Sequence, residues 1–278
     1  MLIPCRPGNP IEYMAAIGLA KITGLAIRWE HESRVQIDGV VDPCAVACAA
    51  ATFVDLIYDD DIGESWREQV TLSMRSADRP RLDWLACLAS DDGKDIVPSR
   101  FRFASGQQRW LRTMRQAAEL VTEESVMRWR DANTWPREHR MTMCGWDCGS
   151  FTPAAHRWDA SDTTAGSRGN PVGLYLACEG LQAWPCMQGQ TAGWVGRCVR
   201  FPLWREFQSW DWIRSVTVTS AIHGRMDDEI VIGDDWETDQ TIVSRTEYLR
   251  GIGVDAVFES HMNRLTQWRF ELSAWRGV

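Results

Sequence analysis

GNPIEYMAAIGL at residues 8–19 and GNPVGLYLACEGL at residues 169–181 are two forms of one sequence pattern. With one extra residue in the second segment, the Gly-Asn-Pro, Tyr, Ala and Gly-Leu positions coincide. Asparagine caps free amides at the start of a helix, and proline at the first helical position lacks only an N–H that has no partner there. The pattern therefore predicts one helix that starts at Pro10 and a second that runs from Pro171 to about residue 184.

The first segment carries further helix signals. Glu12 follows Asn9 by three residues, which is the spacing of a capping box. Gly18 and Gly180 each cost about 1 kcal/mol relative to alanine within a helix, so they indicate the close approach of another element. We expect a buried helix against a sheet, and we interpret the two segments as an internal duplication, with chance similarity as the alternative. The apolar face expected at helical spacing consists of Ile11, Met14, Ala15, Gly18, Leu19 and Ile22.

Composition is typical of a soluble globular protein. The 278 residues are 45% apolar and 24% charged, and the net charge is −8. No apolar run approaches the roughly 18 residues of a membrane span, and the first residues lack the apolar core of a signal peptide. Nine cysteines, an odd number without a secretion signal, indicate reduced thiols. We expect a cytoplasmic protein that does not contact a membrane.

The pattern along the chain predicts an α+β protein in which mixed helices pack on small antiparallel sheets. It also predicts two related halves, residues 1–140 and 141–278, joined by a linker at residues 133–138. Alternating apolar and polar residues predict a hairpin formed by residues 26–30 and 35–39. Further helices are expected at residues 42–58 (fully buried), 79–90, 106–130 and 259–268, strands at 101–103, 141–144, 194–201 and 213–219, and an exposed acidic hairpin or loop at 227–239.

The most basic stretch of the chain spans residues 96–118, which hold five arginines and no acid. Because the protein is acidic overall, any nucleic-acid contact has to use a local patch of this kind. Arginine and amide side chains beside aromatic residues suit phosphate and unpaired bases. The alternative is an amphipathic helix whose solvated face is basic without a partner. The predicted nucleic-acid interface consists of Arg100, Arg102, Gln107, Gln108, Arg109, Arg112 and Arg115, the last three sharing one helix face.

Metal-binding patterns are weak. Cys44 and Cys48 lie four residues apart, as do Cys144 and Cys148, and four thiolates could bind zinc. The spacing is not Cys-x-x-Cys, however, and cysteines in a helix of small residues pack as compact apolar side chains. The acids at residues 227–235 could attract magnesium, but nothing in the pattern imposes an octahedral arrangement. We predict no metal ligands and no cofactor.

Catalytic patterns are equally weak. Cys148 or Ser150 could act as a nucleophile, with His156 as its base and Asp159 orienting that base. No strand–turn–helix elbow frames these residues, and the chain lacks a Walker loop, a dinucleotide fingerprint and a kinase motif. We predict no catalytic residue.

The first helix segment resembles the opening of subunits encoded in type I CRISPR loci of the G subtype, formerly called U. Those subunits begin with Asn-Pro, followed by an aliphatic residue, Ala and Gly-Leu at similar spacing. The order of later motifs in this chain is similar too. These motifs are FASGQQ at residues 103–108, GWD at residues 145–147, the second Asn-Pro helix at residues 170–181, and FPLW at residues 201–204.

The resemblance implies a non-catalytic, large-subunit-like component of an RNA-guided, Cascade-like complex. Such a subunit contacts target DNA or guide RNA and helps flanking-motif recognition and assembly. The implied partners are guide RNA, target DNA, other CRISPR subunits and a helicase–nuclease. This chain is short for a large subunit, which leaves open whether it performs the whole task.

Three alternatives stay open at this point. The first is a guide-RNA end-binding subunit of the same system. The second is a thiol- or metal-dependent enzyme that uses Cys144, Cys148 and His156. The third is an interaction scaffold without nucleic-acid contacts, which the acidic composition would suit.

Overall fold

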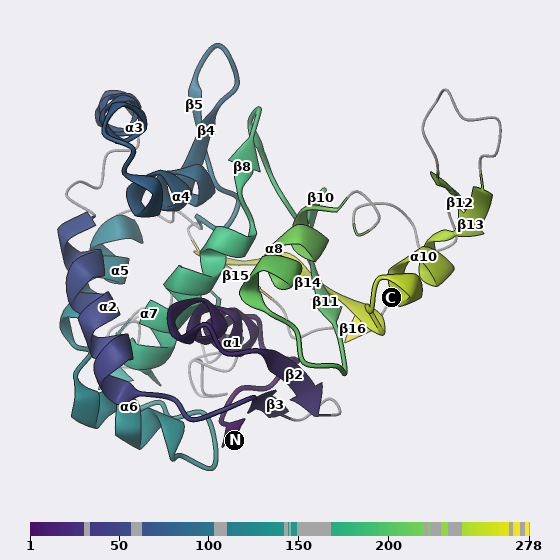
Figure 1. Cartoon of the computed structure of the whole chain (residues 1–278). Helices are drawn as coiled ribbons and strands as arrows, with labels where there is room; N and C mark the ends of the chain where they lie inside the picture. Colours follow the sequence, from purple (N-terminus) through teal and green to yellow (C-terminus); the bar gives the residue numbers. More distant parts are fainter. Residues whose placement is uncertain are drawn as a thin grey trace.

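The fold is α+β, as the sequence predicts. Most helices lie in the left and central parts of the view, and small antiparallel sheets lie above, below and to the right of them (Figure 1). The structure is a computed structural model, and it describes residues 1–30, 34–56, 63–102, 110–141, 144, 146–148, 168–219, 222, 229–232, 241–266, 269–272 and 276–277.

The two Asn-Pro segments form the central pair of helices, α1 (Pro10–Thr23) and α7 (Pro171–Gly180). Both predicted helices are confirmed, each with asparagine at its N-cap and proline in its first turn. We expected the glycines to face a sheet, and this was wrong. They face each other across the two helices. Because neither glycine has a Cβ, the two backbones approach more closely than side chains would allow.

Helices α2, α5, α6 and α8 pack against this pair, and α5 also packs against α2. Helix α2 shows the expected position but not the expected burial, because only Val46, Ala50 and Phe53 of its residues are buried. It is therefore an amphipathic surface helix. The described helices outside the central pair are α2 (Pro43–Leu56), α3 (Glu64–Arg75), α4 (Arg79–Leu88), α5 (Trp110–Glu119), α6 (Glu123–Arg130), α8 (Trp210–Val218), α10 (Arg245–Gly251) and the 3-10 turn η3 (Leu181–Ala183).

The long helix expected at residues 106–130 is two helices in its described part. The break follows α5, and Thr122 then caps α6 by accepting from the backbone N–H of Ser125. Ser125 in turn accepts from the backbone N–H of Thr122, which completes a capping box. This reciprocal cap favours a new helix start over continuation of the old helix.

Two sheets flank the helix pair. The three-stranded sheet has the order β1-β3-β2 and contains the predicted N-terminal hairpin, and the larger sheet has the order β10-β11-β14-β15, with β16 also paired to β14. Backbone hydrogen bonds between Ile27 of β2 and Gln208 link the three-stranded sheet to the segment between β11 and α8. The strands are β1 (Leu2–Ile3), β2 (Ile27–Glu30), β3 (Arg34–Ile37), β10 (Trp194–Val195), β11 (Cys198–Leu203), β14 (Ala256–Thr266), β15 (Arg269–Leu272) and β16 (Arg276–Gly277).

The remaining described strands form four two-stranded antiparallel sheets. The acidic segment predicted as a hairpin or loop at residues 227–239 contains β12, which pairs with β13, and its residues 227–228 and 233–239 lie outside the described residues. These strands are β4 (Ala89–Asp91) with β5 (Ile96–Pro98), β6 (His139–Arg140) with β7 (Arg168–Gly169), β8 (Cys186–Met187) with β9 (Gln190–Thr191), and β12 (Glu229–Ile232) with β13 (Thr241–Ser244).

Two predicted elements have the opposite secondary structure. Residues 213–219, expected as a strand, belong almost entirely to helix α8, whose cap Ser209 accepts from the N–H of Trp212. Residues 259–266, expected as a helix, belong to strand β14, which pairs with β11 along six residue positions. Long-range strand pairing decides the second case, and such pairing leaves no local sequence signal.

Two short strands were also predicted wrongly. Phe101 and Arg102 form a turn and a loop rather than a strand, and Phe103 lies outside the described residues. The strand expected at residues 141–144 is displaced to β6, which ends at Arg140.

One hydrophobic core joins the segments that precede and follow residue 140. Tyr13 of α1 lies in it with Trp29 of β2 and with Phe201 and Trp204 of the second segment. The internal duplication and the division into two halves stay predictions. No helix among the described residues has both the length and the apolar content to cross a membrane.

Candidate nucleic-acid interface

Arg100 is the predicted site residue that the structure places on a concave surface. It follows β5, and its backbone N–H donates to Thr191 Oγ1 on β9 at 2.9 Å. Its guanidinium donates through one nitrogen to the carbonyl of Gly196. A guanidinium has five N–H donors in a planar fork, so this contact orients the group and leaves donors for a ligand.

The other predicted residues lie elsewhere. Arg102 is half-buried, Arg112 is exposed, and Arg115 of the same helix α5 bonds Glu119 Oε1 through Nε at 3.0 Å. None of these arginines lines the cavity that contains Arg100. Gln107, Gln108 and Arg109 lie outside the described residues, so the three-arginine face is described only for the two members on α5.

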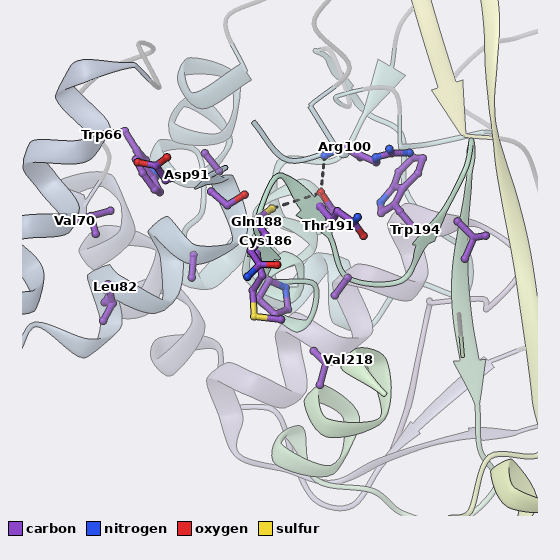
Figure 2. Close-up of a pocket in the computed structure, with 18 of the residues that line it drawn as sticks. Trp66, Val70, Leu82, Asp91, Arg100, Cys186, Gln188, Thr191, Trp194 and Val218 are labelled. Carbon is purple, nitrogen blue, oxygen red and sulfur yellow. Dashed lines mark hydrogen bonds between the residues drawn. The ribbon is translucent and has the colours of Figure 1, made fainter. Parts of the chain in front are cut away.

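The concave surface is an open cleft of about 1090 Å³, bounded by α3, α4 and β4 on one side and by the β8–β9 hairpin and β10 on the other. Figure 2 shows Trp66 and Val70 at one end, and Arg100 beside Trp194 at the other. The lining is mixed, with apolar side chains on the walls and amides on the hairpin. A mixed lining of this kind suits a ligand with flat apolar faces and polar edges.

The hairpin that forms one wall is held by its turn. Gln188 and Gly189 both have positive φ, +49° and +74°, which is the backbone form of a two-residue type I′ turn. The N–H of Gly189 donates to Ser90 Oγ on β4 at 2.8 Å. This bond fixes the hairpin tip against β4, so the width of the cleft is set by the fold.

The cleft carries little net charge among its lining residues, where Arg100 is balanced by Asp91. Its rim exposes apolar side chains, with Met187 67% exposed, Val218 40% and Val195 37%. Exposed apolar side chains that gather around one concave surface are typical of an interaction site or a ligand-binding groove. The cleft therefore combines the guanidinium of Arg100 with aromatic and apolar side chains.

Sequence reasoning found Arg100 but missed the rest of the cleft. Trp66, Gln188 and Trp194 come from three separate segments, and only the fold brings them to one surface. The local signal was Gly189, because glycine accepts the positive φ that a tight hairpin turn requires.

A second polar arrangement lies buried at the start of α1. Asn9 donates through Nδ2 to Glu12 Oε1 at 3.0 Å and to Asp147 Oδ1 at 2.8 Å. Arg137 bonds both oxygens of Asp147, at 2.9 and 3.0 Å. Glu12 and Asp147 have fully buried side chains, and burial of this kind requires paired charges.

This arrangement replaces the capping box expected at Asn9 and Glu12. The Asn9 side chain makes no capping bond, and Glu12 instead accepts from the backbone N–H and the guanidinium of Arg6. In α7 the corresponding Asn170 does cap its helix, by accepting from the N–H of Gly173 at 3.0 Å. In α1, Glu12 and Asp147 both accept from Nδ2 of Asn9, so the side chain is held by its amide nitrogen and its oxygen makes no capping bond.

The four cysteines of the zinc alternative do not assemble into a metal-binding group in the described part of the chain. Cys44 and Cys48 are exposed on α2 with their sulfurs 3.9 Å apart, whereas Cys144 is buried. Burial raises the pKa of the Cys144 thiol to about 12, so that thiol stays protonated at neutral pH. Ser150, His156 and Asp159 of the proposed triads lie outside the described residues.

Comparison with known proteins adds no assignment, because no protein family model and no curated protein sequence matches the chain.

Proposed function

We propose that this protein is a non-catalytic subunit of an RNA-guided CRISPR complex, and that it contacts guide RNA or target DNA through the cleft around Arg100. The observation that carries the proposal is the cleft itself. It joins an oriented guanidinium with two tryptophan side chains and the amide of Gln188 on one concave surface.

Each group in the cleft has a counterpart in a nucleotide. The Arg100 fork suits a phosphate, because guanidinium–phosphate contacts use two parallel N–H donors. Half-buried Trp66 offers ring surface for stacking, which is worth about 1–3 kcal/mol per base and works for any base. Trp194 also lines the cleft but is only 8% exposed. Gln188 can bond a base edge as donor and acceptor.

The motifs of the CRISPR resemblance support a non-catalytic role. Asn9 and Asp147 are hydrogen-bonded, and Nε1 of Trp146 donates to the carbonyl of Phe101 at 2.9 Å. The ring of Tyr13 lies 4.9 Å from that of Phe201, centroid to centroid. These residues come from four of the quoted motifs or their neighbours and meet in the core, where they stabilise the fold and have no access to a substrate.

The stacking surface favours a single-stranded partner, because bases within a duplex are not free to stack on tryptophan. This supports the guide-RNA end-binding alternative as the second candidate function. The two candidates differ in ligand preference: an end-binding subunit prefers single-stranded RNA, and a flanking-motif reader prefers duplex DNA.

The test starts from the assembled complex. The tagged chain is co-expressed with its genomic neighbours and a CRISPR array, and RNA that co-purifies is sequenced. We expect one discrete repeat-derived RNA together with other subunits. An RNA-free protein without these partners would overturn the proposal.

The cleft is then tested with Arg100→Ala in the same complex, using fluorescence anisotropy with single-stranded RNA and duplex DNA at several salt concentrations. We expect at least tenfold weaker binding and a salt slope reduced by about one. Arg128→Ala is the matched control, because Arg128 is exposed on α6 beside Glu124 and does not line the cleft. Equal behaviour of the two variants would show that the cleft is not the contact surface.

A further inference from the structure

Three potential metal ligands share one face of the large sheet, beside the cleft, because Val195 of the cleft lining is the strand partner of Cys198. In the β11–β14 pair, Cys198 lies directly opposite His261 and Arg200 lies directly opposite Glu259. Residues two apart on a strand point to the same side, and opposite residues on paired strands have neighbouring Cβ atoms. Cys198, Glu259 and His261 therefore form one cluster, held by backbone pairing rather than by flexible loops.

The distances within the cluster fit a zinc ion. The Nδ1 atom of His261 lies 3.0 Å from Cys198 Sγ, and its Nε2 atom lies 3.8 Å from that sulfur and 3.7 Å from Glu259 Oε2. With bonds of about 2.3 Å to sulfur and about 2.1 Å to nitrogen and oxygen, tetrahedral zinc separates such ligand atoms by about 3.4–3.6 Å. The ligand atoms of all three residues lie within 4.8 Å of one another. Small side-chain rotations are enough to close these gaps.

Arg200 holds Glu259 in a position that suits monodentate binding. Its Nε and another guanidinium nitrogen both lie 2.7 Å from Glu259 Oε1, and its remaining nitrogen donates to the carbonyl of Ile222 at 2.8 Å. One carboxylate oxygen is thus fixed, and Oε2 faces the imidazole of His261. Groups that orient a ligand in this way typically change metal affinity 10–100-fold when they are removed.

We propose that Cys198, Glu259 and His261 bind a zinc ion, with a fourth position left for water or for a donor from a partner. Thiolate, imidazole and carboxylate together are a ligand set that zinc accepts. Before a metal binds, Arg200 balances the charge of Glu259, and the thiol loses its proton only as zinc binds. The ion would bridge β11 and β14. This inference does not rest on the nucleic-acid role.

Zinc must displace the proton of the thiol. Burial, followed by the charge of Glu259, raises the pKa of the Cys198 thiol, whereas Arg200 lowers it. Zinc affinity is therefore expected to weaken as the pH falls, because protons compete with the metal for sulfur and nitrogen.

The test uses the purified full chain, stripped with a chelator, reloaded with zinc chloride and passed through a desalting column. We expect about one zinc per chain by elemental analysis. Cys198→Ser and His261→Gln should each reduce affinity at least 100-fold in competition with a coloured chelator. The control replaces both Cys44 and Cys48 of α2 with serine, because those exposed thiols lie 3.9 Å apart and could also attract zinc. It should leave zinc content unchanged.

A second measurement needs no variant. The zinc-loaded and stripped chains are treated with iodoacetamide, and each cysteine is followed by peptide mass spectrometry. Zinc should protect Cys198 and leave Cys44 and Cys48 unprotected. Failure to retain zinc, protection confined to Cys44 and Cys48, or full zinc content in a folded Cys198→Ser variant would each overturn the proposal.

Discussion

Gly18 of α1 and Gly180 of α7 occupy reciprocal positions across the two central helices. A Cβ on Gly18 would lie 1.8 Å from the carbonyl oxygen of Leu176, and a Cβ on Gly180 would lie 2.0 Å from that of Met14. Met14 and Leu176 each precede the glycine of their own helix by four residues. The two helices thus approach each other through the same pair of positions.

Replacing either glycine should damage this contact. Gly18→Ala places a methyl group against backbone, which no side-chain rotation relieves, so we expect a loss of about 2–4 kcal/mol in the free energy of unfolding. Urea denaturation followed by tryptophan fluorescence measures the loss. Gly251→Ala in α10 is the control, because no atom lies within 4 Å of its added Cβ. Equal stability of the two variants would contradict the close packing.

Asp147→Asn should destabilise the protein through the buried network at Asn9. The change removes the charge that pairs with Arg137 and leaves Arg137 against Glu12 alone, at 4.0 Å. Breaking a fully buried pair costs about 3–5 kcal/mol, and we expect about 2–3 kcal/mol here because Arg137 keeps 26% of its side chain exposed.

The matched control for this substitution is Glu119→Gln, which removes the exposed partner of Arg115. Exposed pairs contribute less than about 1 kcal/mol. Thermal unfolding of both variants gives the comparison, and an Asp147→Asn effect no larger than that of the control would contradict the network.

Tyr13→Phe should remove one buried hydrogen bond without creating a large cavity. The Tyr13 hydroxyl donates to the carbonyl of Pro202 at 2.6 Å, and its ring stacks on Trp29 with centroids 5.0 Å apart. We expect a loss of about 1–2 kcal/mol in the free energy of unfolding, because the buried carbonyl of Pro202 loses the hydrogen bond from Tyr13. Unchanged stability in urea denaturation would show that the bond contributes nothing.

The thiol of Cys44 should react faster when Cys48 is replaced by alanine. The hydrogen bond and charge of Cys48, followed by the charge and hydrogen bond of Glu123, raise the pKa of Cys44 from its ordinary value of 9.0 to about 11. A raised pKa lowers the thiolate fraction at pH 8, and the thiolate is the reactive species. We expect at least tenfold faster alkylation of Cys44 in Cys48→Ala at pH 8, measured by peptide mass spectrometry. Because the pKa falls, the rate should also level off at a lower pH than in the natural chain.

Elements with local signals were predictable from the sequence. The Asn-Pro starts specify α1 and α7, and alternation specifies the β2–β3 hairpin, since capping and strand periodicity act between near neighbours. In contrast, residues 213–219 and 259–266 were assigned the wrong structure. Their β-branched and polar patterns do not reveal that Ser209 caps a helix or that β11 pairs with β14.

The candidate sites depended on the tertiary structure even more strongly. The sequence indicated Arg100 as part of a basic stretch, but that stretch divides between the cleft and the surface of α5. Trp66 and Trp194 are 128 residues apart in sequence, and Cys198 is 63 residues from His261. Only folding brings such residues together, because their proximity follows from strand pairing and helix packing that no local pattern records.

The sequence by itself determined where the two central helices begin, and it marked Gly18 and Gly180 as sites of close approach. What approaches them was decided by the tertiary structure: each glycine meets the carbonyl of the other helix and not a sheet. The physical reason is that a missing Cβ is a property of one residue, whereas the atom that fills the space belongs to a distant segment.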